Sequence, residues 1–254
     1  MYINDLITAV NQLSLGVNID GVKVSILAYA DDVVLLAESE NDLNIMLDCL
    51  QSWCVLNKMS VNASKSKVVH FRNPSVVRTT CVFKCGEQVL EVVHSYNHLG
   101  LLLTEHLDYK RMAKAVASSA SRALGLLITK FKLLGGMNYH TYTKLYNSMV
   151  WSTLEYGVAI WGVYDFSFNN AVQNRAMRFF LGLRMFAPNN AVIGDMGWTP
   201  SYVLQWRSVV GFYRRLCNIT ADRTTRIPLE YFTGPITTHL EIREIGISKS
   251  ITNF

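Results

Sequence analysis

The sequence predicts an α+β fold in which strands dominate the first hundred residues and helices dominate the rest. Short aliphatic and β-branched runs, such as residues 23–27 and 33–37, have the length and composition of strands. Apolar residues spaced three and four apart over residues 108–134 indicate a long helix. Half of the 254 residues are hydrophobic, which is enough to build one large core or two modest ones.

Charge is distributed unequally along the chain. Residues 1–104 contain 7 Lys and Arg against 10 Asp and Glu, whereas residues 105–254 contain 17 against 9. An acidic first part suits metal binding, and a basic second part suits either a polyanionic partner or a solvated surface without a partner. We find no disulfide framework, signal peptide or apolar run of ~18 residues, so we expect a soluble intracellular protein, cytoplasmic or nuclear, with no membrane partner.

Two amphipathic helices and several strands are expected in the first part. Helical spacing of apolar residues predicts a helix over residues 2–15 that ends near Gly16. Ser39 and Asp42 form a capping-box pattern at the start of a second helix, which ends near Asn57 and packs under a sheet. Further strands are expected at residues 59–61, 67–71, 80–84, 89–93 and 99–103.

Two adjacent carboxylates, Asp31 and Asp32, lie between the first two predicted strands. We expect a β-hairpin with both at its tip. Because apolar flanks imply burial, and buried carboxylates need a compensating cation, the pair indicates a divalent metal site. Mg²⁺ is the hard cation that prefers such oxygen ligands. The alternative is an ordinary turn, where Asp is common because it bonds to its own backbone.

The run Tyr29-Ala30-Asp31-Asp32 inside two apolar strands resembles the signature box of reverse transcriptases. Residues 28–37 are similar to the version found in non-LTR (LINE-like) retrotransposons. The resemblance implies a partial polymerase palm over residues 1–104, a helical thumb and connection over 105–200, and a poorly defined helical extension over 201–254. It makes Asp31 and Asp32 the catalytic, metal-binding carboxylates of a two-metal nucleotidyl transfer, and Tyr29 a nucleic-acid contact.

A lysine box follows the second predicted helix. The passage from Trp53 through Asn62 to Phe71 resembles the family's next box, in which a lysine approaches the phosphates of the incoming nucleotide. The resemblance gives this catalytic role to Lys65, with Lys67 as its substitute and as a nucleic-acid contact. The alternative is an exposed lysine in a turn.

A third box lies in the last strands of the first part. The stretch from Tyr96 to Gly100 resembles the family's primer grip, in which a tight hairpin holds the primer end. The resemblance implies this role for Tyr96, Leu99 and Gly100, although Asn97-His98 alters the usual hydrophobic spacing. The nearby zinc-like spacing of Cys81, Cys85, His94 and His98 is not expected to bind zinc, because no short knuckle frames it.

One face of the helix predicted over residues 108–134 is basic. Arg111, Lys114, Ser118 and Arg122 are spaced 3, 4 and 4 apart, on a different face from the apolar stripe. Arg111, Lys114 and Arg122 can therefore neutralise phosphates along a duplex, and a solvated helix face is the alternative. The aromatic residues beyond this helix could stack on bases, but at helical spacing they are more often core.

The residues that resemble the family include neither the fingers nor the first catalytic Asp of such polymerases. The Mg²⁺ site is therefore expected to be incomplete. The sequence therefore predicts a reverse transcriptase (RNA-directed DNA polymerase) fragment that is inactive alone. Its partners would be an RNA template and DNA primer, or their duplex, and dNTP only if the missing N-terminal region is supplied. The alternatives are a non-catalytic nucleic-acid-binding protein derived from a retrotransposon, or an inert fragment whose unpaired sheet edge impairs folding.

Overall fold

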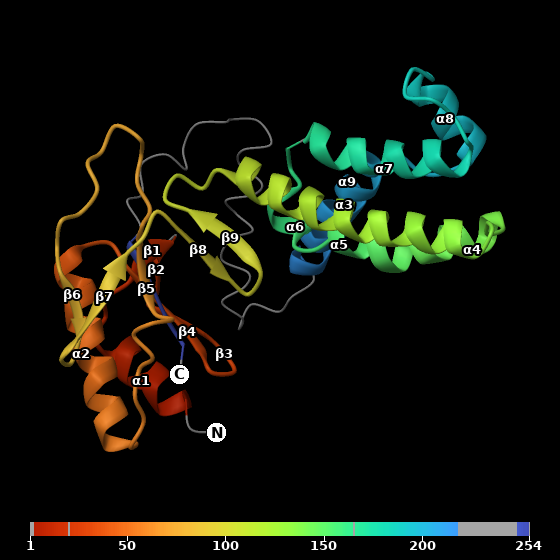
Figure 1. Cartoon of the computed structure of the whole chain (residues 1–254). Coiled ribbons are helices and arrows are strands. Elements are labelled where there is room, and N and C mark those ends of the chain that lie inside the picture. Colours follow the sequence, from red (N-terminus) through yellow and green to blue (C-terminus); the bar gives the residue numbers. More distant parts are fainter. Residues whose placement is uncertain (1–2, 20, 165, 218–247, 254) are drawn as a thin grey trace. The chain divides into compact units, whose positions relative to one another are not determined.

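The computed structural model describes residues 3–19, 21–164, 166–217 and 248–253 (Figure 1). The chain divides into two compact units. The first unit comprises Met1–Asp108 with Ile219–Phe254, and the second comprises Tyr109–Asn218. Within the described ranges, no helix is both long enough and apolar enough to cross a membrane.

The first unit mixes helices with short strands, as the α+β prediction requires. Two helices precede and follow the first hairpins, and the remaining elements are strands. In chain order the elements are α1 (Ile3–Gln12), β1 (Val17–Ile19), β2 (Val22–Val24), β3 (Ile26–Tyr29), β4 (Asp32–Ala37), α2 (Glu40–Leu56), β5 (Lys67–His70), β6 (Phe83–Cys85), β7 (Gln88–Val92), β8 (Ser95–His98), β9 (Leu101–Thr104) and β10 (Ser248–Asn253).

Six of these strands form one sheet in the order β3-β4-β10-β5-β7-β6. The pair β5–β7 is parallel, and the other neighbours are antiparallel. The pairs β1–β2 and β8–β9 form separate two-stranded hairpins. The prediction of an unpaired sheet edge is wrong for β4, because β3 and β10 pair with its two edges.

Strand β4 has apolar packing on both faces. Val33, Leu35 and Ala37 join the larger core, to which α1 and α2 contribute Leu6, Val10 and a stripe of buried residues. Val34 and Leu36 face the other way and form a smaller cluster with Val17 of β1. The stripe of α2 comprises Leu43, Met46, Leu47, Leu50, Trp53 and Cys54. A strand buried on both faces reads as the continuous aliphatic run seen here.

Helix α2 begins and ends as its sequence predicts. The Ser39 side chain accepts a hydrogen bond from the backbone N–H of Asp42 at 3.1 Å, which satisfies one of the free donors of the first turn. Asn57 is the C-terminal cap, and Lys58 then adopts a φ of 55° that ends the helix. The prediction that Ser39 caps this helix is confirmed.

The predicted strand over residues 23–27 is wrong as a single element. The structure breaks it at Ser25 into β2, which pairs with β1, and β3, which pairs with β4. Ser25 donates a hydrogen bond to the carbonyl of Leu15, and its own carbonyl accepts one from Leu36 at 2.8 Å. Gly16 makes the close approach possible, because a Cβ there would lie 2.7 Å from the Val24 carbonyl oxygen.

Other strands are shorter or differently placed than predicted. Residues 59–61 form no strand, and the strand expected at residues 80–84 is confined to β6. Residues 201–254, for which a helical extension was predicted, contain α9 at one end and the sheet strand β10 at the other. The polar composition of β10 explains why no strand was predicted there.

The second unit is helical in its described residues. Its elements are α3 (Tyr109–Leu133), α4 (Tyr139–Leu145), the π-helix η1 (Tyr146–Trp151), α5 (Ser152–Leu154), α6 (Val158–Trp161), α7 (Ser167–Phe180), α8 (Asn189–Met196) and α9 (Ser201–Cys217). Asn138 caps α4, because its side chain accepts a 2.8 Å hydrogen bond from the N–H of Thr141.

Aromatic side chains form much of the core of the second unit. Tyr142 and Tyr146 are buried, and Tyr146 stacks on Trp198 with ring centroids 4.2 Å apart. Phe131 of α3 lies edge-on to Tyr142 at 5.8 Å. The Tyr142 hydroxyl donates to the carbonyl of Ala176 at 2.9 Å, so its polar end is satisfied in the interior. Tyr142 and Tyr146 are therefore core residues and are not available for stacking on bases.

Candidate functional site

The hairpin of β3 and β4 presents the two predicted carboxylates. Tyr29 pairs with Asp32, so Ala30 and Asp31 form a two-residue turn between the strands. Ala30 has a φ of 54°, in the left-handed region that a residue with a Cβ rarely adopts. Backbone strain of this kind is often found where a side chain must be held in a functional position.

The expectation that this tip is buried is wrong. Asp31 is exposed, Asp32 is partly buried, and Tyr29 is 68% exposed. The reason is that β3 is the edge strand of the sheet, so only Ile26 of its residues is buried. The carboxylates are therefore accessible to an ion or a nucleic acid, and burial gives no argument for a bound cation.

Alternation along β4 assigns Asp32 to one face of the sheet. Val34 and Leu36 belong to the smaller cluster, on the face opposite to α1 and α2. Side chains two residues apart share a face, so Asp32 lies on the side of Val34 and Leu36. Tyr96 of β8 packs against the same cluster. The predicted metal ligand and the predicted primer-grip tyrosine therefore lie on the same side of β4.

Tyr96 also contacts the lysine box. Its hydroxyl donates a hydrogen bond to the carbonyl oxygen of Lys65 at 2.9 Å. The Lys65 side chain is exposed, and its turn is closed by a hydrogen bond from its N–H to the Asn62 carbonyl at 3.1 Å. Lys67 differs, because its ammonium group forms an ion pair with Glu91 at 2.9 Å. Of the two lysines, Lys65 is thus the better placed to reach a phosphate.

The β8–β9 hairpin turns tightly at Leu99 and Gly100. Both residues have positive φ values, 47° and 77°, which is the backbone pattern of a type I′ turn. Such a turn matches the twist of the flanking strands and fixes their register, in which Tyr96 pairs with Leu103. The tight hairpin predicted for residues 96–100 is thus present, and its role in holding a primer stays a prediction.

Asp31 and Asp32 have the donor chemistry that Mg²⁺ requires. This ion is commonly held by one or two carboxylates together with water and substrate phosphates. In the part of the chain that the structure describes, no group of three or more His, Cys, Asp or Glu is positioned to hold a metal ion. The pair therefore fits a shared site and does not form a complete cage.

The cysteines and histidines with zinc-like spacing have other contacts. Burial raises the pKa of the Cys85 thiol to about 11, which opposes the thiolate that zinc needs. Cys85 lies 3.4 Å from the Gln51 side-chain oxygen, and Cys81 lies 3.8 Å from the Asn44 amide nitrogen. His94 instead contacts the carboxylate of Glu105 at 3.1 Å.

A charged cluster around Glu105 was not predicted from sequence. The buried Glu105 carboxylate pairs with Arg78 at 2.6 Å and with Arg72 at 3.2 Å, and it lies near His94 and His106. Burial acts to raise the pKa of Glu105, but the Arg78 hydrogen bond and the charges of Arg78, Arg72 and His106 lower it further than burial raises it. The cluster links the segment after β5 to the end of β9. Its members are far apart in sequence, so local sequence patterns do not reveal it.

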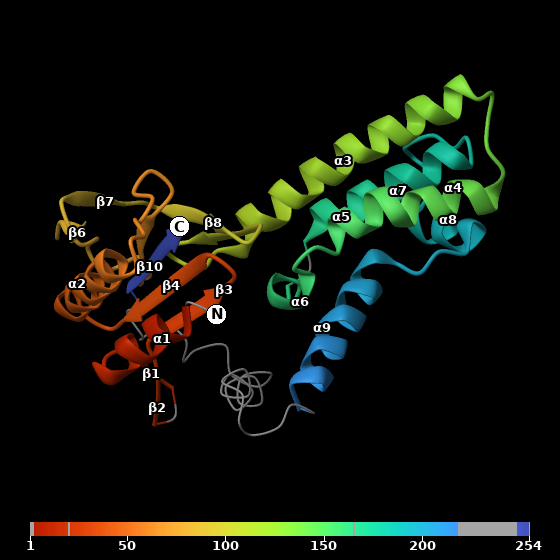
Figure 2. The same cartoon turned by 90° about the horizontal axis from the view of Figure 1, so that it is seen from below.

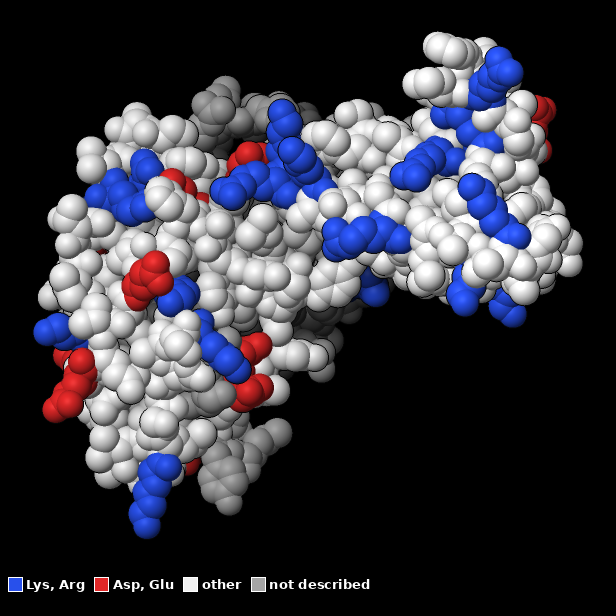
Figure 3. All heavy atoms as spheres, in the orientation of Figure 1, with Lys and Arg blue, Asp and Glu red and all other residues white. Residues whose placement is uncertain are grey.

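In the second unit, the basic face of α3 borders a groove. Arg111, Lys114 and Arg122 are exposed, and Arg122 also donates to the hydroxyls of Ser118 and Ser119. Lys114 and Ser118 line a shallow hollow of about 320 Å³ between α3 and α7, together with Ala117, Ser121, Phe168, Ala171, Val172 and Arg175. Figure 3 shows Lys and Arg outnumbering acidic residues on the visible face of this unit. Arg175 extends the basic surface onto a second helix.

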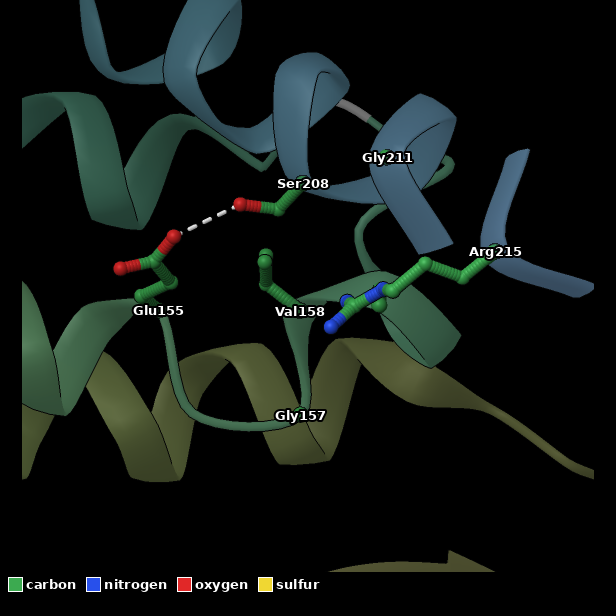
Figure 4. Close-up of a pocket in the computed structure, with 7 residues that line it drawn as sticks. Glu155, Gly157, Val158, Ser208, Gly211 and Arg215 are labelled. Carbon is green, nitrogen blue, oxygen red and sulfur yellow. Dashed lines mark hydrogen bonds between the residues drawn. The ribbon is translucent and has the colours of Figure 1, made fainter. Parts of the chain in front are cut away.

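A further hollow lies between α6 and α9 (Figure 4). Ser208 donates a hydrogen bond to the Glu155 carboxylate at 2.7 Å, and Arg215 points toward Val158. The hollow has a volume of about 240 Å³. Its lining includes one carboxylate, Glu155, and one guanidinium, Arg215, whose opposite charges offset each other. It therefore has less electrostatic attraction for phosphate than the α3–α7 groove.

Comparison with known proteins finds similarity to reverse transcriptases. Residues 1–126 match the family model described as reverse transcriptase (RNA-dependent DNA polymerase). The chain is also similar to the RNA-directed DNA polymerase from mobile element jockey of Drosophila funebris, with 25% identity over 147 residues. That alignment covers 56% of this chain but 16% of the relative, so the chain corresponds to a small part of that protein.

Proposed function

We propose that the chain is the distal palm and thumb of an RNA-directed DNA polymerase from a non-LTR retrotransposon, because its residues 1–126 match the reverse transcriptase family. One observation carries the proposal: the Tyr29–Asp32 hairpin presents two accessible carboxylates, with Asp32 on the side of the sheet where Tyr96 packs. Asp31 and Asp32 would share in binding metal, and Tyr29 would contact nucleic acid.

The neighbouring residues suit a primer end and a nucleotide. Tyr96 packs on β4 and bonds to the backbone of Lys65, so its hairpin and the lysine turn support each other. Leu99 and Gly100 would hold the primer strand through the tight turn, and the exposed Lys65 ammonium would approach phosphate oxygens. Lys67 would contribute less, because its pairing with Glu91 neutralises it.

Mg²⁺ would be held by Asp31 and Asp32 together with groups outside the described residues. Bound there, it would lower the pKa of the primer hydroxyl and stabilise charge on the phosphates. Two carboxylates are too few for two such ions, so the chain alone is expected to be inactive. dNTP would bind only when a further protein segment completes the site.

Metal binding is tested by Mn²⁺ titration of the isotopically labelled full chain, observed by NMR. We expect selective broadening of amide resonances at residues 29–34, because Mn²⁺ is a paramagnetic substitute for Mg²⁺. Asp31→Asn combined with Asp32→Asn should abolish the effect, whereas Asp48→Asn, at an exposed carboxylate of α2, should not. Unchanged broadening in the double variant would contradict the assignment.

Polymerase activity is tested separately. The purified chain, given a DNA-primed RNA template, dNTP and Mg²⁺, should not extend the primer. Extension that is lost in Asp31→Asn would show that the site is complete within this chain, and would overturn the expectation of inactivity while supporting the family chemistry.

A second candidate function is non-catalytic nucleic-acid binding by the helical unit. It is favoured by the α3–α7 groove, where Lys114 and Arg175 flank apolar and hydroxyl side chains. Cationic side chains beside a groove can follow a phosphate backbone without reading its sequence. Arg111 and Arg122 would extend the interaction along α3. An RNA–DNA hybrid is the expected ligand.

Duplex binding is tested by fluorescence anisotropy across a range of salt concentrations. The double variant Lys114→Glu, Arg175→Glu should weaken binding at least tenfold and reduce the salt slope by about 2, roughly one for each phosphate that is no longer neutralised. Lys130→Glu with Lys132→Glu is the control, because these exposed lysines lie on the same helix outside the groove. Equal weakening in both variants would indicate a general charge effect and no groove.

A further inference from the structure

The last described strand in the sequence, β10, lies in the interior of the main sheet. β10 is between β4 and β5 and antiparallel to both, as Figure 2 shows for β10 beside β4. β4 and β5 are therefore parallel to each other, with α2 in the connection between them. This crossover skips one position of the sheet and leaves a gap one strand wide, with β4 and β5 roughly 9–10 Å apart.

The gap requires a strand. Residues 33–37 of β4 are buried, and one edge of β4 is already paired with β3. Its other edge pairs with β10 residue by residue, from Ala37 opposite Ser248 to Asp32 opposite Asn253. β5 pairs with β10 from Lys67 to His70. With the gap empty, the backbone N–H and C=O groups along these edges would lose their hydrogen-bond partners, which is unfavourable.

The sequence of the inserted strand is unusual for its position. Ser248 to Asn253 reads Ser-Lys-Ser-Ile-Thr-Asn, with a single aliphatic residue, whereas interior strands are normally rich in Val, Ile and Leu. Main-chain hydrogen bonds must therefore supply most of its affinity for the gap. Such bonds can be formed by any extended segment, which is the basis of strand addition between proteins.

The connection to this strand is long. Residues 218–247 separate α9 from β10, and a segment of this length can span at most on the order of 100 Å. Insertion of β10 therefore joins strands that are distant in sequence, and it takes place within one chain. A strand of another chain that offers the same backbone hydrogen bonds would compete with it for the gap.

We propose that β4 and β5 form a strand-accepting slot, and that Ser248–Asn253 of the same chain occupy this slot as an exchangeable insert. The register places Asn253 opposite Asp32, so the slot opens beside the carboxylate tip. Exchange of the insert changes which backbone lies next to Asp32, without altering the β3–β4 hairpin that presents it.

The test is hydrogen–deuterium exchange of the full chain, read by mass spectrometry. Ser250→Pro removes a backbone donor within the insert, and Ser250→Thr is the matched control, because a β-branched residue suits a strand. We expect exchange at residues 32–37 and 67–70 to rise at least tenfold in the proline variant only. Residues 109–133 of α3 provide the internal reference. Exchange within twofold of the parent at residues 32–37 would overturn the proposal.

A second experiment tests the proposal even if Ser250→Pro unfolds the whole first unit. A chain ending at residue 247 is purified with a synthetic peptide of residues 248–254, and the peptide is then removed and restored. Protection of residues 32–37 should fall when the peptide is removed and return when it is restored, but it should not return with the same peptide carrying Ser250→Pro, which lacks one backbone donor. No response to the peptide refutes the slot. If protection in the parent chain exists only in a dimer, the insert belongs to a second copy and the intrachain assignment is wrong.

Discussion

Single residues distant in sequence determine much of the stability of the first unit. Glu105 illustrates this, because its buried carboxylate compensates the charges of Arg72 and Arg78. We expect Glu105→Gln to lower the free energy of unfolding by about 3 kcal/mol, since removing one member of a buried pair leaves the other charges uncompensated. Urea unfolding measures the decrease, and Glu87→Gln, in the exposed β6–β7 turn, is the control.

The same carboxylate predicts a pH dependence. The pKa of Glu105 is lower in the folded chain than its ordinary value of 4.5, so its stabilising contribution is present above that pH and is lost as the pH falls through the folded pKa. The difference in unfolding free energy between the parent and Glu105→Gln should therefore shrink below about pH 4.5. A constant difference down to pH 3 would contradict this account.

His70 predicts a second pH dependence of stability, at a higher pH than that of Glu105. Burial and the charge of Arg72 lower its pKa from 6.5, Arg78 adds to this, and Glu40 and Glu105 oppose it. Neutral Nδ1 accepts a hydrogen bond from the N–H of Thr79 at 3.1 Å.

Because the folded pKa of His70 is depressed, its contribution is present above about pH 6.5 and declines as the pH falls. His70→Asn keeps an acceptor without the titration, so its stability should vary less between pH 7 and 5. Thermal unfolding at several pH values measures this. His140→Asn, at an exposed position of α4, should retain the slope of the parent.

At the scale of elements, the close approach of Gly16 to Val24 and Ser25 accompanies the break between β2 and β3. Gly16 has a φ of +127°, and a Cβ there would meet Val24 and Ser25 at 2.7–2.9 Å. Gly16→Ala should therefore destabilise the first unit by about 3 kcal/mol, through strain and displacement of β2. Gly21→Ala shares the positive φ but has open space, so it should cost about 1 kcal/mol. Urea unfolding compares the two variants, and equal destabilisation would show that the close approach is unimportant.

Elements governed by local chemistry were predictable from sequence. The periodicity of α3, the Ser39 cap and the β3–β4 hairpin depend on neighbouring residues, and all are present. The break at Ser25 was not predictable, because its cause lies nine residues earlier at Gly16. The exposure of Asp31 was also missed, since an aliphatic flank cannot reveal that β3 is an edge strand.

At the scale of the molecule, the two units have separate cores. In the second unit the buried residues of α3, Tyr142, Tyr146 and Trp161 all lie within Tyr109–Asn218. We expect residues 109–217 alone to unfold in one cooperative thermal transition, with a near-UV circular dichroism signal from the packed aromatic rings. Retained helix without that signal would indicate a molten state and would contradict the prediction.

The part of the candidate site that is formed by consecutive residues was predictable from sequence. The part that is formed by residues distant in sequence was not. Tyr29, Asp31 and Asp32 are adjacent in sequence, whereas the bond from Tyr96 to Lys65 joins residues 31 positions apart. Arg175 reaches the groove from α7, and no spacing rule relates it to Lys114 of α3. β10 was missed because its polar sequence lacks the aliphatic pattern of an interior strand.

The position of β10 also affects how the protein is made. A ribosome releases residues 32–70 long before residues 248–253, so β4 and β5 emerge without the strand that joins them. During translation both strands offer free edges to chaperones or to neighbouring nascent chains. Closure of the sheet waits for Ser248–Asn253 to clear the exit tunnel, and the speed at which that stretch is synthesised therefore influences the yield of native protein.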